Sequence, residues 1–147
     1  ICNELTGENF SIKAIETISA VISEVDIISC ATFSKNPLVL GNYLRAGQHV
    51  DLVGSYKKDM READDEAILK SQVFVDTYQG GLKESGDIVI PLQKGILKES
   101  DINVDLFELC SHKKKGRQHK DEITIFKSVG HGSEDLAAAT YYFNKFR

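Results

Sequence analysis

Two apolar runs that each lead into a turn of small residues constrain this chain most. Residues 50–53 lead into Gly54-Ser55, and residues 122–129, in which apolar and polar side chains alternate, lead into Gly130. Both runs are typical of a β-strand that ends in a tight turn. In open α/β sheets, ligands bind just outside the carboxyl ends of the strands. The pattern therefore predicts a binding site beside these two turns.

Helical and strand-like segments alternate along the first half of the chain. Apolar residues recur at helical spacing over residues 11–25, which predicts a helix with one buried face and Ser11 as its N-cap. Because parallel strands are joined by crossover helices, the alternation predicts an α/β fold with a parallel sheet. Short strands are expected at 26–32, 49–53 and 73–76, and short helices at 39–45 and 64–71.

The second half of the chain has less regular patterns. Residues 87–92 are apolar, but Pro91 favours a loop or an edge segment over a central strand. Residues 101–110 have the spacing of a short amphipathic helix, and residues 112–121 predict a basic loop. The remaining predicted elements are a half-buried strand at 122–129 and a final helix at 133–146, capped by Ser133.

Length and charge limit the class of protein. A chain of 147 residues suggests a single domain. The formal net charge of -4 argues against nucleic acid as the main partner. The basic run at 112–120 is expected to be a solvated loop, because it lacks the aromatic residues that stack on bases. No apolar run approaches the roughly 18 residues of a membrane helix, so no membrane contact is expected.

The three cysteines are widely spaced. Cys2, Cys30 and Cys110 form no CxxC pair, which argues against a zinc site or a disulfide framework. The sequence contains no HExxH motif or close histidine–cysteine pairing, so no metal site is expected. Cys30 lies in an apolar run and is expected to be a small core residue. This cysteine pattern fits a reducing cytoplasm.

A complete dinucleotide-binding fold needs a glycine-rich turn between its first strand and helix, so that the backbone can approach the pyrophosphate. No GxGxxG motif occurs in this chain. The acidic residue expected about 20 residues after that turn cannot be placed either. The residues alone therefore leave the cofactor open.

Several segments, taken in their order, resemble the C-terminal half of the ornithine cyclodeaminase/mu-crystallin family, whose members use a nicotinamide cofactor. The resemblance begins near residue 11 and continues to the C-terminus. Each segment alone is a weak signal, but their ordered sum is specific. The matching segments are 26–32 with Asn36-Pro37-Leu38, 47–54, 59–65, 73–76, 83–87, 126–130 and 134–139.

The resemblance implies a division of the chain into two parts. Residues 1–125 would form part of an NAD(P)-binding Rossmann-like domain, a partial parallel sheet with flanking helices. Residues 126–147 would form a C-terminal return segment whose helix leads toward a dimerisation domain absent from this chain. The glycine-rich turn and the N-terminal domain would lie upstream. Intact family members are usually homodimers, so we expect a homodimer or completion by a separate N-terminal half.

The resemblance also assigns roles to residues at the predicted strand ends. It places Thr32 near the cofactor, Leu52 and Val53 beside the nicotinamide ring, Ser128 against the cofactor and Val129 against the substrate. A strand-end hydroxyl can hydrogen-bond a ribose or carboxamide, and apolar side chains keep water from the hydride path. A capping threonine, a core valine and a turn serine are the ordinary structural alternatives, and the residues alone leave both interpretations open.

One departure from the family bears on the reaction. Ornithine cyclodeaminases have an aspartate where this chain has Tyr56, and that aspartate is the proposed acid/base for amine oxidation and ring closure. A tyrosine hydroxyl has a reference pKa of about 10 and is a much weaker base at neutral pH. Reducing a cyclic imine needs only hydride at the C=N carbon and one proton at the nitrogen. Tyr56 therefore favours imine reduction, and packing at the mouth of the cleft is its structural alternative.

The resemblance thus implies part of an NAD(P)H-dependent reductase of cyclic imino acids, such as pyrroline-2-carboxylate or piperideine-2-carboxylate. The family's catalytic lysine and substrate-binding cations would lie upstream. One alternative is ornithine cyclodeaminase itself, which converts ornithine to proline and ammonia. The other is a non-catalytic, mu-crystallin-like binding protein or the remnant of a split gene. An exposed apolar face on the final helix, around Leu136, Tyr141 and Phe143, would favour a split gene.

Overall fold

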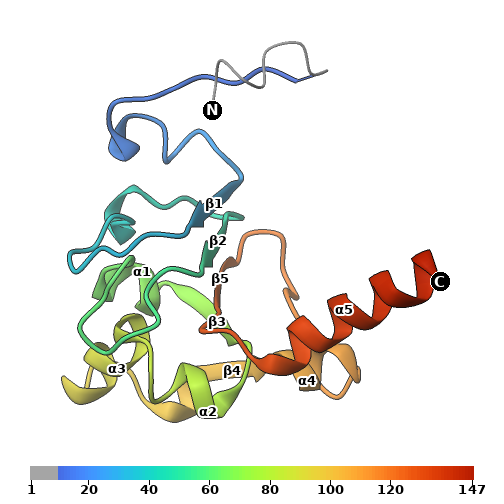
Figure 1. The fold of residues 1–147 in the computed structure, drawn as a ribbon. Helices are drawn as coiled ribbons and strands as arrows, with labels where there is room; N and C mark the ends of the chain where they lie inside the picture. Colours follow the sequence, from blue (N-terminus) through green and yellow to red (C-terminus); the bar gives the residue numbers. More distant parts are fainter. Residues whose placement is uncertain (1–9) are drawn as a thin grey trace.

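The computed structural model describes residues 10–147 and contains a five-stranded parallel sheet. The order across the sheet is β1-β2-β5-β3-β4, so the last strand in the sequence lies at its centre (Figure 1). The α/β fold with a parallel sheet is therefore confirmed. The strands are β1 (Ile27–Cys30), β2 (His49–Leu52), β3 (Ser71–Val75), β4 (Ile102–Asp105) and β5 (Ile123–Lys127).

Short helices connect the strands, and one longer helix ends the chain. The predicted helix at 64–71 is confirmed as α1, whereas residues 39–45 contain only the 3-10 turn η2. The α-helices are α1 (Asp65–Leu69), α2 (Tyr78–Gly81), α3 (Gly86–Gln93), α4 (Leu106–Cys110) and α5 (Gly132–Phe146). The 3-10 turns are η1 (Ile18–Ala20), η2 (Gly41–Tyr43) and η3 (Glu99–Asp101).

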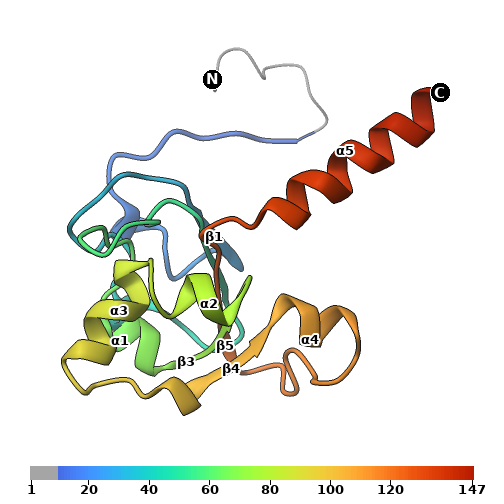
Figure 2. The same cartoon turned by 60° about the horizontal axis from the view of Figure 1, so that its bottom comes forward.

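The hydrophobic core lies on one face of the sheet. Val50, Ile125 and Val73 lie side by side on β2, β5 and β3, because the strand register pairs Ile125 with both valines. Ile68 of α1 and Ile88 of α3 belong to the same cluster. Figure 2 shows α1 and α3 together on this side of the sheet. The core is therefore built mainly by one face of the sheet together with α1 and α3.

The opposite face of the sheet is only partly covered. Helix α4 and the loop that follows it lie on this side (Figure 1), beside an open groove of about 500 Å³ lined by Phe74, Leu106, Leu109 and Phe126 among others. Within the described residues, β1 pairs only with β2, and Ile27 on this strand is 67% exposed. One edge of the sheet and much of one face are thus open.

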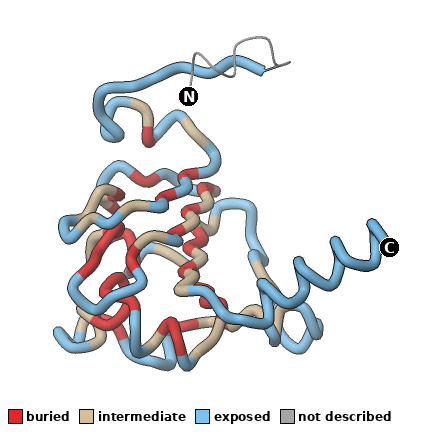
Figure 3. The backbone as a smooth tube through the Cα atoms, viewed as in Figure 1, coloured by how far each residue is buried: buried red, intermediate tan, exposed pale blue. Residues whose placement is uncertain are grey.

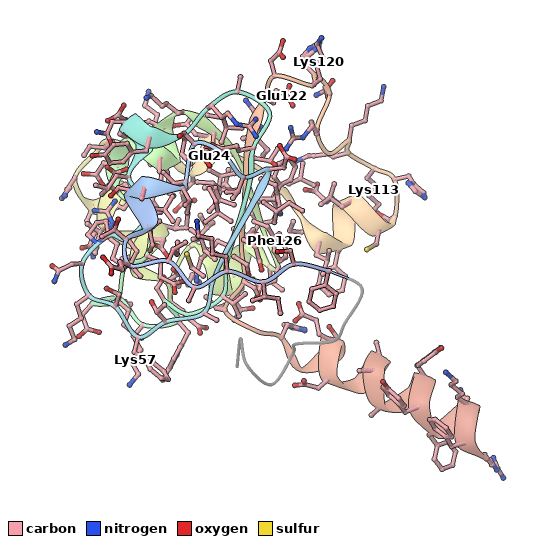
Figure 4. All side chains as sticks on the ribbon, turned by 90° about the horizontal axis from the view of Figure 1, so that it is seen from above. Glu24, Lys57, Lys113, Lys120, Glu122 and Phe126 are labelled. Carbon is pink, nitrogen blue, oxygen red and sulfur yellow. The ribbon has the colours of Figure 1, made fainter. Side chains whose placement is uncertain are left out.

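The basic loop is solvated, as predicted. Lys113 and Lys120 are exposed, and Figure 4 shows them on the outer side of the loop, across the molecule from Lys57. Arg117 is also exposed, but it donates hydrogen bonds to the carbonyls of Gly47 (2.6 Å) and Gln48 (3.0 Å). Arg117 therefore attaches the loop to the segment before β2, together with a backbone hydrogen bond from the Gly47 N–H to the Asp121 carbonyl (3.1 Å).

Helix α5 extends away from the body of the molecule (Figures 1 and 2), and none of its residues is buried. Leu136, Tyr141 and Phe143 are all exposed, so the apolar face expected on this helix is present. His131, rather than the predicted Ser133, is its N-cap, and the ring nitrogen Nδ1 accepts a hydrogen bond from the Ser133 N–H.

The helix predicted over residues 11–25 is wrong. Only the turn η1 forms there, and Ile12, Ile15 and Ile18 are exposed. β-branched residues have low helix propensity, and a helix of this length needs a packed apolar face to be stable in water. Ile22 is the single buried residue between 11 and 25, so the segment lacks such packing and Ser11 caps no helix.

The loop or edge segment predicted at 87–92 is also wrong, because α3 forms there. Ser85 caps the helix by accepting a hydrogen bond from the Asp87 N–H (3.3 Å), and Ile88 and Val89 are buried. Pro91 lies inside the helix, where a proline costs about 3 kcal/mol. Burial of the apolar side chains offsets that cost.

The amphipathic helix predicted at 101–110 is instead a strand followed by a short helix. Ile102 and Val104 are buried and alternate with half-buried residues on β4. Asp105 then begins α4, since its carboxylate accepts a hydrogen bond from the Glu108 N–H (2.8 Å). An alternation over four residues is too short to distinguish from helical spacing.

None of the helices among residues 10–147 has the length and apolar character that a membrane crossing requires. Cys30 is buried as expected, and Cys110 is exposed. Burial, reinforced by nearby carboxylates, raises the pKa of the Cys30 thiol to about 11. Cys2 lies outside the described residues.

Candidate functional site

The turns after β1, β2 and β5 meet at the carboxyl edge of the sheet. Strand β2 lies between β1 and β5, and the register pairs Leu52 with Cys30 on one side and with Lys127 on the other. The residues that follow these strand ends, including Thr32 and Ser128, therefore lie at one edge of the sheet. Both turns identified in the sequence are found here, together with the turn after β1.

A buried carboxylate, Glu62, joins the turn after β1 to the turn after β2. Its Oε1 accepts hydrogen bonds from the N–H (2.6 Å) and the hydroxyl (2.8 Å) of Thr32. Its Oε2 accepts from the N–H groups of Gly54 (2.9 Å) and Ser55 (3.3 Å). Burying a carboxylate is costly unless donors satisfy its charge, and here the two turns provide them.

The backbones of the same two turns touch at Gly54. A Cβ atom on Gly54 would lie 2.1 Å from the carbonyl oxygen of Thr32 and 2.2 Å from its nitrogen. No side chain fits in that space, so this position requires glycine because of a close backbone approach. The small-residue turn in the sequence is therefore a contact point between two strand ends.

Beneath these turns, Asp87 and Lys127 form a fully buried charged pair. Lys127 Nζ lies 3.7 Å from Asp87 Oδ2 and donates a hydrogen bond to the Leu52 carbonyl (3.0 Å). Asp87 accepts hydrogen bonds from the N–H of Glu62 (2.8 Å) and from the Ser55 hydroxyl. Burial lowers the pKa of Lys127 below its ordinary value, and the carboxylates of Asp87 and Glu62 oppose that shift.

The turn after β5 is held by Asp76, which follows β3. Asp76 Oδ2 accepts hydrogen bonds from the N–H groups of Val129 and Gly130 (both 2.8 Å) and from the Ser128 hydroxyl (3.2 Å). Gly130 has a φ of 89°, in the left-handed region that favours glycine. Three buried carboxylates, those of Glu62, Asp87 and Asp76, thus fix the turns at this edge.

The residues predicted to contact cofactor or substrate differ in how far they are buried. The Leu52 side chain is fully buried in the core, whereas Val53 is 45% exposed on the turn. Thr32, Ser128 and Val129 are half-buried. Thr32 donates its one hydroxyl proton inside the protein, so toward a ligand its oxygen can only accept a hydrogen bond.

Tyr56 lies at the rim of the site beside Phe33. Their rings meet edge to face with centroids 6.3 Å apart, and Tyr56 is 41% exposed. The side chain of Ser55, just before it, points inward to Asp87. Lys57 Nζ lies 5.5 Å from the centre of the Tyr56 ring. The two aromatic residues, one from each turn that Glu62 joins, form an apolar rim.

A cavity of about 420 Å³ adjoins the turn after β5. Gly130 and His131 line it from that turn, with Thr77, Gly80 and Phe107 on other sides. The larger groove lies on the open face of the sheet and is lined by none of the predicted site residues. Within residues 10–147, no cluster of three or more His, Cys, Asp or Glu side chains is arranged to hold a metal ion.

Comparison of the sequence with known families gives a match over the whole chain. Residues 1–147 match the profile of the ornithine cyclodeaminase/mu-crystallin family. The chain belongs to that family. Among curated members, it is 36% identical over 137 residues to a Delta(1)-pyrroline-2-carboxylate reductase from Paracoccus denitrificans, covering 93% of this chain and 43% of that protein.

Solved structures of the ornithine cyclodeaminase/mu-crystallin family have the same fold. The Delta(1)-pyrroline-2-carboxylate reductase of Thermococcus litoralis, in complex with NADH and L-proline, matches with a TM-score of 0.87 and 40% identity, over 92% of this chain and 42% of that one. A probable ornithine cyclodeaminase from Bordetella pertussis matches with a TM-score of 0.77 and 35% identity, over 87% and 41%. The chain thus spans about two fifths of these relatives.

The sequence did not identify the residues that hold the site together. Glu62, Asp76 and Asp87 are buried, although acidic residues are usually exposed. The position of Asp76 directly after an apolar strand was one available signal, and the acidic Asp87 in an apolar run was another. Nothing in the local pattern around Glu62 indicates that its side chain is buried.

Proposed function

We propose that this chain forms the nicotinamide end of the cofactor site in an NAD(P)H-dependent reductase of cyclic imino acids, such as pyrroline-2-carboxylate. The observation that carries the proposal is the set of three strand-end turns held by Glu62, Asp87 and Asp76 at the edge where open α/β sheets bind ligands. The likeness to a reductase in complex with NADH and L-proline supports both the cofactor and the substrate class.

The residues of the chain fit one end of such a cofactor. Val53 and Val129 offer apolar surface for a nicotinamide ring, and a Cβ on Gly130 would meet nothing within 4 Å, so the space beside it is open. The chain has no GxGxxG turn for the pyrophosphate. The fit therefore covers the nicotinamide end only.

The proposed reaction asks little of this chain's own side chains. The bound cofactor supplies hydride to the C=N carbon of the substrate. Val53, Phe33 and Tyr56 would exclude water from the site, and the Ser128 turn would contact cofactor and substrate. Tyr56, in place of the aspartate of ornithine cyclodeaminases, favours imine reduction over ornithine cyclodeamination. The likeness to a probable ornithine cyclodeaminase keeps that reaction as the second candidate.

The proposal includes an assembly and a location. Residues up to 125 would belong to the cofactor-binding domain, and 126–147 would lead toward a dimerisation domain. The exposed apolar face of α5 and the open edge of β1 favour a homodimer of the intact protein, or completion by an N-terminal half. We infer a cytoplasmic location from the cysteine pattern.

Nuclear magnetic resonance titration of the chain tests the cofactor proposal. NADH and its reduced nicotinamide mononucleotide half should both shift the amide resonances of Val53, Ser128 and Val129. Adenosine monophosphate, the other half, should shift none of them, because the chain lacks the pyrophosphate turn. Absence of any shift at these amides with millimolar NADH would reject the proposal. NADH oxidation by the intact protein with pyrroline-2-carboxylate, and not with ornithine, then distinguishes the two reactions.

A further inference from the structure

We propose that Glu62 is a positioning residue, which sets the distance between the turns after β1 and β2 and thereby the fit of the nicotinamide ring. The inference rests on the proposed function, because it assigns Glu62 a role in that same site. Glu62 acts through Thr32, Gly54 and Ser55 and need not touch the cofactor.

The backbone of Glu62 is firmly held. Its N–H donates a hydrogen bond to Asp87 Oδ1 (2.8 Å), and its carbonyl accepts from the N–H groups of Leu38 and Val39 (both 2.8 Å). These bonds tie residue 62 to α3 on one side and to the segment after β1 on the other. The carboxylate therefore extends from a fixed point of the backbone.

The two oxygens of the carboxylate divide between the two turns. Oε1 receives both hydrogen bonds from Thr32, and Oε2 receives those from Gly54 and Ser55. The rigid geometry of one carboxylate thus fixes one turn relative to the other. Phe33 and Tyr56 lie next to these hydrogen bonds, and their rings meet across the gap, so the same contact sets the width of the rim.

An apolar contact could join two loops without desolvating a charge. A carboxylate adds direction, because N–H and O–H donors must point at its oxygens at hydrogen-bond distance. Directional fixing matters where reacting atoms must be held to within a fraction of an ångström. A buried carboxylate whose partners all lie in the two turns of the proposed site is what such positioning requires.

The test substitutes Glu62→Gln in the full chain and uses Glu66→Gln as the matched control. Glutamine keeps the shape of the side chain, but its NH₂ group must face N–H or O–H donors of one turn. Glu66 is exposed and pairs with Lys70 on the surface of α1, so its substitution leaves the site intact. NADH affinity is measured by calorimetry, and amide hydrogen exchange at Thr32, Gly54 and Ser55 reports the contact itself.

We expect Glu62→Gln to weaken NADH binding about tenfold or more and to speed exchange at these amides, while Glu66→Gln stays within about twofold of the unsubstituted chain. A folded Glu62→Gln variant with unchanged NADH affinity would overturn the inference and leave the proposed function standing. Failure of the unsubstituted chain to bind NADH would reject the proposed function together with the inference.

If Glu62→Gln does not fold, amide hydrogen exchange in the unsubstituted chain tests the positioning role of Glu62. The Thr32, Gly54 and Ser55 amides should share a common opening free energy, once each exchange rate is corrected for its intrinsic rate, because loss of one carboxylate contact exposes all of them. NADH should raise that common opening free energy. Independent opening free energies that NADH leaves unchanged would overturn the inference.

Discussion

The turns at the carboxyl edge have irregular backbone but are held by buried side chains, whereas helix α5 is regular but exposed. The turns after β1, β2 and β5 are irregular, yet the buried carboxylates of Glu62 and Asp76 accept hydrogen bonds from their backbone N–H groups, and that of Asp87 accepts one from the Ser55 hydroxyl. Helix α5 is the longest helix among the described residues, and all of it is exposed (Figure 3). Tertiary contacts rather than regular secondary structure thus determine where this chain tolerates change.

The largest effect is expected from Gly54→Ala in the turn after β2. The added methyl group would overlap the backbone of Thr32, which cannot move without breaking the hydrogen bonds to Glu62. We expect a loss of about 3 kcal/mol or more in the free energy of unfolding, measured by urea denaturation. Gly132→Ala in α5, where a Cβ meets nothing within 4 Å, is the control and should cost almost nothing. Equal losses would contradict the comparison.

A smaller loss is expected when the buried pair below the turns is broken. Asp87→Asn leaves Lys127 buried without its carboxylate partner and should cost about 3 kcal/mol at neutral pH. The pKa of Lys127 is already lowered in the folded state, and loss of Asp87 lowers it further. The cost should therefore shrink as the pH rises through the lowered folded-state pKa of Lys127, below the ordinary lysine value of 10.5, because a neutral Lys127 no longer needs a carboxylate partner. Urea denaturation of both proteins at several pH values measures the cost of Asp87→Asn. A cost that grows with pH would contradict the proposed pairing of Lys127 with Asp87.

The turn after β5 should respond locally to Asp76→Asn. One carboxylate oxygen accepts three donors there, and an amide offers only one oxygen in total. We expect a loss of about 1–2 kcal/mol and faster hydrogen exchange at the Val129 and Gly130 amides. The Thr32 amide, in a different turn, serves as the internal control and should be unaffected.

The smallest effect on stability is expected in α5. Phe143→Ser removes an exposed aromatic ring and should change the free energy of unfolding by no more than about 0.5 kcal/mol. Ile125→Ser, at a buried position of β5, should cost several times more in the same urea titration. A large loss at Phe143 would show that α5 packs against part of the molecule.

The sequence predicted the regular architecture better than the network that holds the site. The strands at β1, β2, β3 and β5 were recognisable because their apolar runs reflect burial in the sheet. The prediction for segment 11–25 was wrong, because helical spacing indicates which side chains would form an apolar face. It does not indicate whether another part of the protein covers that face. Strand β4 was missed for a different reason, because an alternation of apolar and polar residues over four positions is too short to distinguish a strand from a helix.

The sequence could predict only those parts of the site that lie next to a strand along the chain. Gly54 and Ser128 were identified because turns follow strands in sequence. Glu62 and Asp87 were not, because their hydrogen bonds reach residues that are distant in the sequence: Glu62 to Thr32 spans 30 positions, and Asp87 to Ser55 spans 32. The strand order of the sheet creates these contacts, and only the folded structure reveals them.

The central place of β5 in the sheet has a consequence for folding. Strands β2 and β3 do not pair with each other, and each pairs with β5, the last strand to be synthesised. Until residue 127 is available, the chain can form only two separate ribbons, β1-β2 and β3-β4. Contacts between distant segments form slowly because closing long loops costs entropy. The sheet should therefore assemble late and in one cooperative step, when β5 inserts between the two ribbons.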